Sequence, residues 1–160
     1  MALLLTPNID VLVCGGRDYD KKDELEFVLD FVLDKLQTLL MSGTFLHNEN
    51  PMDCITIIHG AARGADSLAG EWAESRGLKV KEFPADWDKY GIKAGTIRNK
   101  QMLDENDISY TIAFPGGTGT QNMITQALKR KTPRVITYDK GALHELQSGR
   151  KLVLGLDGIE

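Results

Sequence analysis

The chain has 160 residues, 42% of them apolar and 26% charged, and a formal net charge of −4. This composition suits one soluble globular domain with a buried core, which we expect to span residues 1–160. The acidic balance argues against nucleic acid as the main partner, because domains that grip it carry a basic excess. No apolar run is long enough to cross a bilayer and no signal peptide is apparent, so we expect a cytoplasmic protein with no membrane partner.

Short apolar runs alternate with longer amphipathic ones along the chain. In the first half, this pattern predicts strands over 9–16 and 54–60, helices over 21–40 and 64–76, and a polar loop over 42–53. In the second half, it predicts strands over 78–85, 108–114 and 134–139, a loop over 86–95, helices over 96–106 and 120–131, and one short edge strand within 149–158. Alternating strands and helices predict an α/β fold: a mainly parallel sheet of five or more strands, with helices on both faces.

Ligands of open parallel sheets bind beyond the carboxyl ends of the strands. The segments that leave those ends are "GGRDY", "HGAARGAD", "PADWDKYG" and "PGGTGT", and we expect all of them at one edge of the sheet. They are the segments richest in glycine, polar and aromatic residues. A site for a ligand is therefore predicted at this edge.

The segment "PGGTGT", Pro115 to Thr120, joins the fourth strand to a helix. Gly116, Gly117 and Gly119 let the backbone approach an anion, the helix N-terminus favours negative charge, and the hydroxyl groups of Thr118 and Thr120 can bond phosphate oxygens. The alternative is a tight turn that needs glycine for a positive φ. The segment matches neither the P-loop nor the GxGxxG fingerprint.

The turn after the first strand offers Gly15 and Gly16 for close approach, and Arg17 for pairing with phosphate. The alternative for Arg17 is a surface ion pair with Asp18 or Asp20.

The turn after the second strand opens with Gly60 and Gly64, and Arg63 there faces either a ligand or solvent. Asp66 suits a helix cap, with a bond to a ribose hydroxyl as the alternative.

The loop over 86–95 carries Trp87, which either stacks on a base or plugs the loop. Asp86 lies in the same loop with no helix to cap, which makes it the first candidate for a catalytic acid or base. Arg98 and Asn99 begin the next helix, where Arg98 either clamps an anion or faces solvent.

The two cysteines, Cys14 and Cys54, each lie in an apolar run and are expected to be buried reduced thiols rather than a disulfide or metal pair. His47, His59 and His144 show no metal-binding spacing, so no metal is expected, and no cofactor beyond a nucleotide-type ligand.

The motifs "CGGRDY", "HGAARGADSLAGEWAESRG", "FPADWDKYGIKAGTIRNKQM" and "AFPGGTGTQNM" resemble the SLOG superfamily, in particular its small stand-alone branch related to the YspA and YpsA proteins of bacteria and phages. The resemblance runs from about Val11 to Asp139. It implies a Rossmann-like three-layer sandwich that binds nucleotides or nucleotide-derived ligands, often as a homo-oligomer.

LOG-type phosphoribohydrolases of the same superfamily share "PGGxGT" and an arginine in the preceding helix, here Arg98. Their motif continues to a catalytic glutamate where this chain has Met123, a side chain that can neither accept a proton nor stabilise a cationic transition state. Met123 also fits the inward face of its helix. The resemblance therefore favours a sensor or ligand-capturing protein. A nucleotide-cleaving enzyme that uses Asp86, Asp18 or Asp66 is the alternative, and single-stranded DNA binding of the DprA type is the third.

Overall fold

The computed structural model describes residues 8–42, 50–147 and 150–154. One seven-stranded sheet runs through them in the order β3-β2-β1-β4-β5-β6-β7. Its strands are β1 (Ile9–Cys14), β2 (Ile55–His59), β3 (Lys79–Glu82), β4 (Ile108–Ala113), β5 (Arg134–Asp139), β6 (Ala142–Gln147) and β7 (Arg150–Leu154). Strands β3, β2, β1, β4 and β5 are parallel, and β6 and β7 continue the sheet in antiparallel fashion. The predicted α/β class is confirmed.

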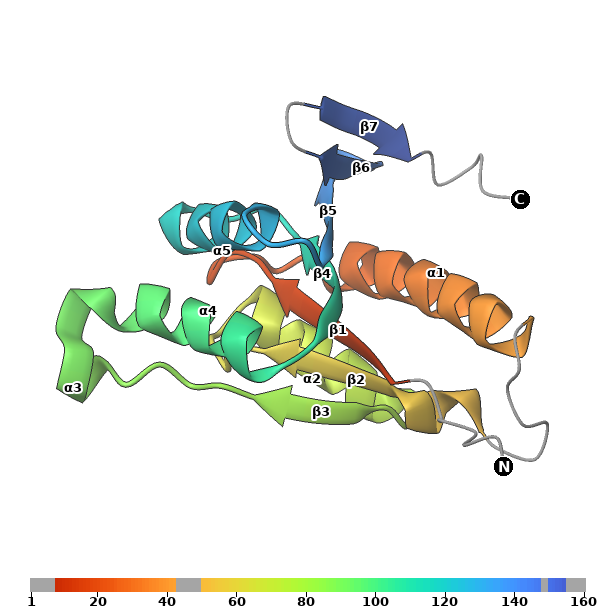
Figure 1. The fold of residues 1–160 in the computed structure, drawn as a ribbon, viewed down its shortest axis with the longest axis horizontal. Helices are drawn as coiled ribbons and strands as arrows, with labels where there is room; N and C mark the ends of the chain where they lie inside the picture. Colours follow the sequence, from red (N-terminus) through yellow and green to blue (C-terminus); the bar gives the residue numbers. More distant parts are fainter. Residues whose placement is uncertain (1–7, 43–49, 148–149, 155–160) are drawn as a thin grey trace.

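Helices cover both faces of the parallel part of this sheet (Figure 1). They are α1 (Lys22–Met41), α2 (Ala65–Ser75), α3 (Trp87–Tyr90), α4 (Ala94–Glu105) and α5 (Thr118–Leu128), with short 3-10 turns η1 (Pro51–Cys54) and η2 (Gly91–Lys93). Strand β1 shows how the layers form, because successive side chains point to opposite faces. Val11 and Val13 pack in the core under α1 and α2, whereas Leu12 and Cys14 pack in the core under α4 and α5. The molecule is thus a three-layer sandwich.

Helix α1 follows the predicted apolar spacing. Its buried residues are Leu25, Val28, Leu29, Leu33, Leu36 and Leu40. Asp23 and Glu24 lie in its first turn, where carboxylates interact favourably with the helix dipole. No helix within the described ranges is long and apolar enough to cross a membrane.

The segment 86–95 was expected to be a loop, and this expectation is wrong. It folds into α3 and η2, and α4 begins at Ala94 rather than at residue 96. The side chain of Asp86 caps α3 by accepting a hydrogen bond from the Lys89 N–H. Gly91, with φ of +58°, then ends α3. Helices this short bury too little apolar surface to give a periodic pattern.

The end of the chain also differs from expectation. Helix α5 spans Thr118–Leu128 rather than 120–131, and β6 was missed altogether. Arg134 on β5 and Glu145 on β6 pair with a closest N···O distance of 2.6 Å. The expected edge strand is confirmed as β7. Most of the expected loop 42–53 lies outside the described residues, and its last part forms η1.

The two thiols lie at opposite edges of the sheet, because Cys14 ends β1 and Cys54 directly precedes the parallel strand β2. Both are buried and not joined in a disulfide, so the expectation of buried thiols is confirmed. Burial raises the pKa of the Cys14 thiol above its usual range.

Candidate functional site

Three loops meet at Gly16, at the carboxyl edge of the sheet. Its N–H donates to the carbonyl of Pro115 at 2.9 Å, and its carbonyl accepts from the N–H of Ala65 at 3.2 Å. These bonds join the end of β1 to the turn before α5 and to the start of α2. The prediction that these segments share one edge is confirmed.

Glycine is required where these loops touch. A Cβ on Gly15 would lie 2.5 Å from the Cβ of Ala65, and one on Gly16 would lie 2.9 Å from the carbonyl oxygen of Pro115. Gly64 has φ of +80°, and a Cβ there would press on the carbonyl of Gly16. These glycines therefore permit the close approach of backbone to backbone.

The turn before α5 does not need glycine for a positive φ, so that alternative is wrong. Gly117 has φ of −100°, and the glycines with positive φ in the described chain all lie elsewhere. A Cβ on Gly116 would press on Thr120, but one on Gly117 or Gly119 would meet nothing within 4 Å. The first turn of α5 thus borders open space.

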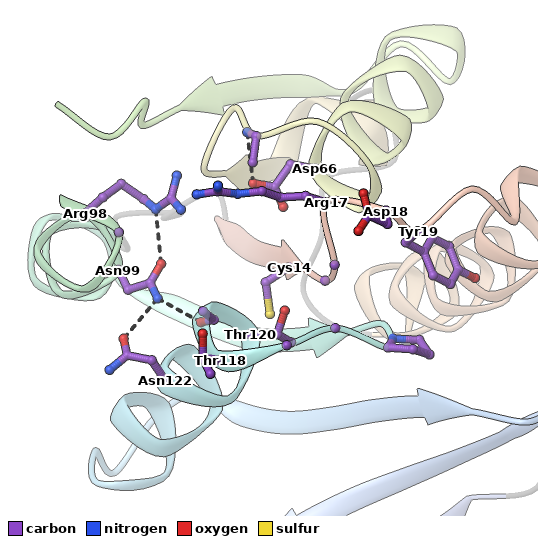
Figure 2. Close-up of a pocket in the computed structure, with 18 of the residues that line it drawn as sticks. Cys14, Arg17, Asp18, Tyr19, Asp66, Arg98, Asn99, Thr118, Thr120 and Asn122 are labelled. Atoms are coloured by element: carbon purple, nitrogen blue, oxygen red, sulfur yellow. Dashed lines mark hydrogen bonds between the residues drawn. The ribbon is translucent and has the colours of Figure 1, made fainter. Parts of the chain in front are cut away.

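That space is an open cleft of about 1150 Å³ (Figure 2). We call it the cleft. The predicted site residues that line it are Gly15, Gly16, Arg17, Asp66, Trp87, Arg98, Asn99, Pro115, Gly116, Gly117, Thr118, Gly119 and Thr120. Gly60 lines an adjoining pocket, whereas Gly64 and Asp86 line neither cavity.

Sequence reasoning missed several lining residues, among them Cys14, Tyr19, Ile92 and Asn122. Cys14 was assigned to the core, yet Figure 2 shows it at the end of β1, between Asp66 and Thr120. Its position directly before the Gly15–Gly16 turn was the signal available.

Arg98 on α4 is held in place by backbone carbonyls. Its Nη1 donates to the carbonyl of Gly60 and, at 3.4 Å, to that of Phe83, while its Nε donates to the Asn99 Oδ1 at 3.1 Å. A Cβ on Gly60 would occupy the place of the guanidinium. Burial lowers the pKa of Arg98, the carboxylate of Asp66 opposes this shift, and the nearby Arg17 adds to it.

Asn99 carries this network across to α5. Its Nδ2 donates to the Gly119 carbonyl at 3.1 Å and to the Asn122 Oδ1 at 3.0 Å. Asn99 is itself buried. The end of β2, the start of α4 and the first turn of α5 are thereby fixed to one another through Arg98 and Asn99 (Figure 2).

Asp66 does not cap its helix, contrary to expectation. Its Oδ2 accepts from the N–H groups of Gly60 at 3.0 Å and Ala62 at 3.2 Å, which fixes the turn after β2. Burial raises the pKa of this carboxyl, and the hydrogen bonds and Arg98 partly oppose the shift. Asp66 is therefore a buried carboxyl at the wall of the cleft.

Arg17 does not form the ion pair considered for it. Its guanidinium carbon lies 4.8 Å from the centroid of the Trp87 ring, a cation–π contact. Asp18 instead lies 3.3 Å from Arg63. Among the described residues Arg17 makes no hydrogen bond or ion pair, so its donors stay available at the cleft.

Asp86 was chosen as a catalytic candidate because it had no helix to cap, and this premise is wrong. Its carboxylate caps α3, and the residue lies outside the cleft.

Met123 is 0% exposed and packs with Leu12 and Met102 in the core beneath α4 and α5. Its predicted core role is confirmed. Among the described residues, no three His, Cys, Asp or Glu side chains gather as a metal site would require.

Known proteins resemble this chain over the region that contains the turns after β1 and β2. The model of the YspA, cpYpsA-related SLOG family matches residues 9–90, from β1 to α3. The Gene 61 protein of Mycobacterium phage D29 is 34% identical over 93 residues, which are 54% of this chain and 74% of that protein. No solved structure matches the chain. The chain therefore belongs to the YspA, cpYpsA-related SLOG family.

Proposed function

We propose that this protein binds a nucleotide or nucleotide-derived ligand in the cleft, as a sensor or ligand-capturing protein. The observation that carries the proposal is an open cleft with positively charged or N–H groups on two sides. On one side, α5 begins without a side-chain cap, and the first N–H groups of a helix have no partner within it. On the other side lie the guanidinium groups of Arg17 and Arg98.

Asp18, Asp20 and Asp66 also line the cleft, and within it the pair Arg17 and Arg98 favours an anion. Arg17 and Arg98 point toward one another in Figure 2, and the positive charge of Arg17 contributes to the lowered pKa of Arg98. Two like charges in a partly desolvated site repel each other, and a phosphate between them would relieve that repulsion. The dipole of α5 adds positive potential from the other wall.

Trp87 supports the nucleotide class in particular. Its side chain is 46% exposed and lines the cleft. An exposed indole beside a phosphate site is a surface on which a base can stack. Membership of the SLOG family supports the same class of ligand.

Cleavage of the bound nucleotide is the second candidate function, and Asp66 is the residue that favours it. A buried carboxyl with a raised pKa at a cleft wall suits a general acid. Met123 lies in the core and Asp86 caps a helix, so neither supports it.

A thermal-shift screen tests the proposal. Purified protein is mixed with nucleoside mono-, di- and triphosphates, dinucleotides and cyclic dinucleotides, and products are read by chromatography. A ligand present at about 100 times its Kd stabilises the native state by about 2.7 kcal/mol, which corresponds to roughly 5–11 °C in Tm for a chain of this size. A ligand recovered unchanged supports binding, and release of free base or phosphate supports the enzyme.

Gly117→Asp is the discriminating variant. A Cβ at Gly117 meets nothing within 4 Å, so the variant should fold, but its carboxylate would repel an anion at the start of α5. Gln101→Asp adds the same charge at an exposed residue of α4 outside the cleft. We expect the ligand-induced shift to be lost in Gly117→Asp and kept in Gln101→Asp. A screen without any shift, or equal shifts in both variants, would contradict the phosphate site.

The cytoplasmic setting is also part of the proposal. Cys14 and Cys54 are buried and not joined in a disulfide, which supports a reducing compartment.

A further inference from the structure

A second cavity of about 390 Å³ adjoins the cleft, beyond the carboxyl ends of β2 and β3. The ionisable residues that line it are Arg17, Arg63 and Arg98, and no acidic residue lines it. We call this cavity the arginine pocket. A cavity lined by three arginines and no carboxylate is built for negative charge.

The arginine pocket and the cleft share part of their walls. Arg17, Trp87 and Arg98 line both cavities. Arg17 lies where the two cavities meet. Its guanidinium contacts the ring of Trp87 and makes no hydrogen bond to the described residues, so its N–H groups can bind a ligand. One ligand can therefore extend from the cleft into the arginine pocket past Arg17.

The positive charge of the arginine pocket is only weakly compensated. Arg63 pairs with Asp18, but the two side chains are 75% and 95% exposed, and solvent screens such a pair. Asp66 attracts Arg98, yet it lines the cleft and not the arginine pocket. Among the described residues, Arg63 is thus the one arginine of the pocket that forms an ion pair, and that pair is exposed.

We propose that the arginine pocket is a second anion subsite of the same ligand site. The ligand is then a nucleotide derivative with two separate anionic groups: one at the first turn of α5 and one between Arg17 and Arg63. A nucleoside monophosphate would fill only half of this site. The inference rests on the proposed function, and the following experiment separates the two.

Crystals soaked in tungstate, a heavy-atom analogue of phosphate, show each anion site by anomalous scattering. We expect one tungstate ion at residues 117–120 and a second in the arginine pocket. A single ion at 117–120 would overturn the second subsite and leave the proposed function intact. A single ion in the arginine pocket would uphold an anion site there and contradict the cradle at α5. Crystals without either ion would overturn both.

Fluorescence gives a second measurement in solution. Of the two tryptophans, Trp72 is 3% exposed and bonded to Asp30, so a change on adding inorganic phosphate reports on Trp87. We expect Arg63→Ala to weaken the affinity for phosphate, measured from this fluorescence change, about two- to fivefold, which is the scale of an exposed ion pair. Asp18→Asn should strengthen the affinity, because Arg63 is then released from its ion pair. Arg130→Ala, which removes an arginine that lines neither cavity, is the matched control.

Equal affinity of the wild-type protein and Arg63→Ala, or equal weakening by Arg63→Ala and Arg130→Ala, would overturn the subsite.

Discussion

Adjacent glycines before α5 have different physical roles. A Cβ on Gly116 would press on Thr120 and lie 2.6 Å from the backbone nitrogen of Gly16, in the junction that joins the three loops. A Cβ on Gly117 would meet nothing. Gly116 thus serves the packing of the three loops, whereas glycine at 117 leaves open space beside the N-terminus of α5.

This difference predicts opposite outcomes for two alanine variants. Gly116→Ala should lower the free energy of unfolding by about 1–3 kcal/mol, because backbone atoms must shift to admit the methyl group. Gly117→Ala should change it by less than about 0.5 kcal/mol, the range of an unhindered surface substitution. Urea denaturation measures both. Equal losses in the two variants would contradict this assignment of roles.

The raised pKa of Asp66 predicts a pH dependence of stability. Because the folded state binds the proton more tightly than the unfolded state, the contribution of Asp66 is complete below its ordinary pKa of 3.8 and is lost as pH rises through the raised value. In Asp66→Asn the amide oxygen can still accept from Gly60 and Ala62, but nothing titrates. The free energy of unfolding of the variant should equal that of the wild-type protein at acid pH and be larger near neutral pH.

Urea denaturation over a pH series checks this expectation. Asp66→Ala, which leaves the N–H groups of Gly60 and Ala62 without their acceptor, should instead lose about 1–3 kcal/mol at every pH. If Asp66→Asn and the wild-type protein instead differ in stability by the same amount at every pH, that result would contradict the raised pKa of Asp66 as the source of the difference.

At the scale of elements, Asp30 joins α1 to α2. Its carboxylate accepts from the Trp72 Nε1 and the Arg76 Nε, both at 2.8 Å, and from the Arg76 Nη2 at 2.8 Å. The hydrogen bond from Arg76 is the main cause that lowers the pKa of Asp30. The two helices cover the same face of the sheet, and Asp66 lies in the first turn of α2.

We expect Asp30→Ala to lower the free energy of unfolding by about 1–2 kcal/mol, the lower part of the range for charged hydrogen bonds because solvent reaches the pair. Since the pKa of Asp30 is lowered, this contribution is present above its ordinary pKa and lost as pH falls through the lowered value. Asp34→Ala on the exposed side of the same helix is the control. Urea denaturation at neutral and acid pH measures the stability of the two variants. An equal loss of stability in Asp30→Ala and Asp34→Ala would contradict a stabilising link between α1 and α2 through Asp30.

The sequence predicted the long elements and missed the short ones for physical reasons. Buried apolar residues repeat over the whole of α1, so their period is unmistakable. Helix α3 has no buried residue and is defined by the Asp86 cap and by Gly91. Strand β6 places Glu145 at a buried position, where Arg134 on the neighbouring strand compensates its charge. Such pairings between distant residues are invisible to a local pattern.

The same limit applied to the site. The shared edge of the four segments followed from the alternation of strands and helices, which predicts parallel strands, and the structure brings three of the segments together through Gly16. The contacts of Arg98 with the Gly60 carbonyl and of Arg17 with the Trp87 ring did not follow, because these partners are remote in sequence. The bonds of Asp66 are local, but its acceptor role depends on the conformation of the turn after β2, which the sequence pattern does not give.

At the scale of the whole molecule, one end of the cleft carries exposed apolar side chains. Ile92 is 96% exposed and lines the cleft together with the exposed Trp87. Tyr90 in α3 and Ile97 in α4 are also exposed and lie within five residues of Ile92 in the sequence. Exposed large apolar side chains that gather at one place commonly mark an interface. The expected homo-oligomer stays a prediction, and this surface is where we expect the contact between two copies.

Ile92→Lys tests it, because a charge at the centre of an apolar contact must be desolvated on association. We expect light scattering to give a mass above 17.7 kDa for the wild-type chain and close to it for Ile92→Lys. Phe27→Lys, at a 61% exposed side chain of α1, is the matched control and should keep the wild-type mass. If Phe27→Lys dissociates the oligomer and Ile92→Lys does not, the contact between the two copies lies at α1 and not at Ile92. A wild-type chain that stays monomeric as its concentration rises would refute self-association.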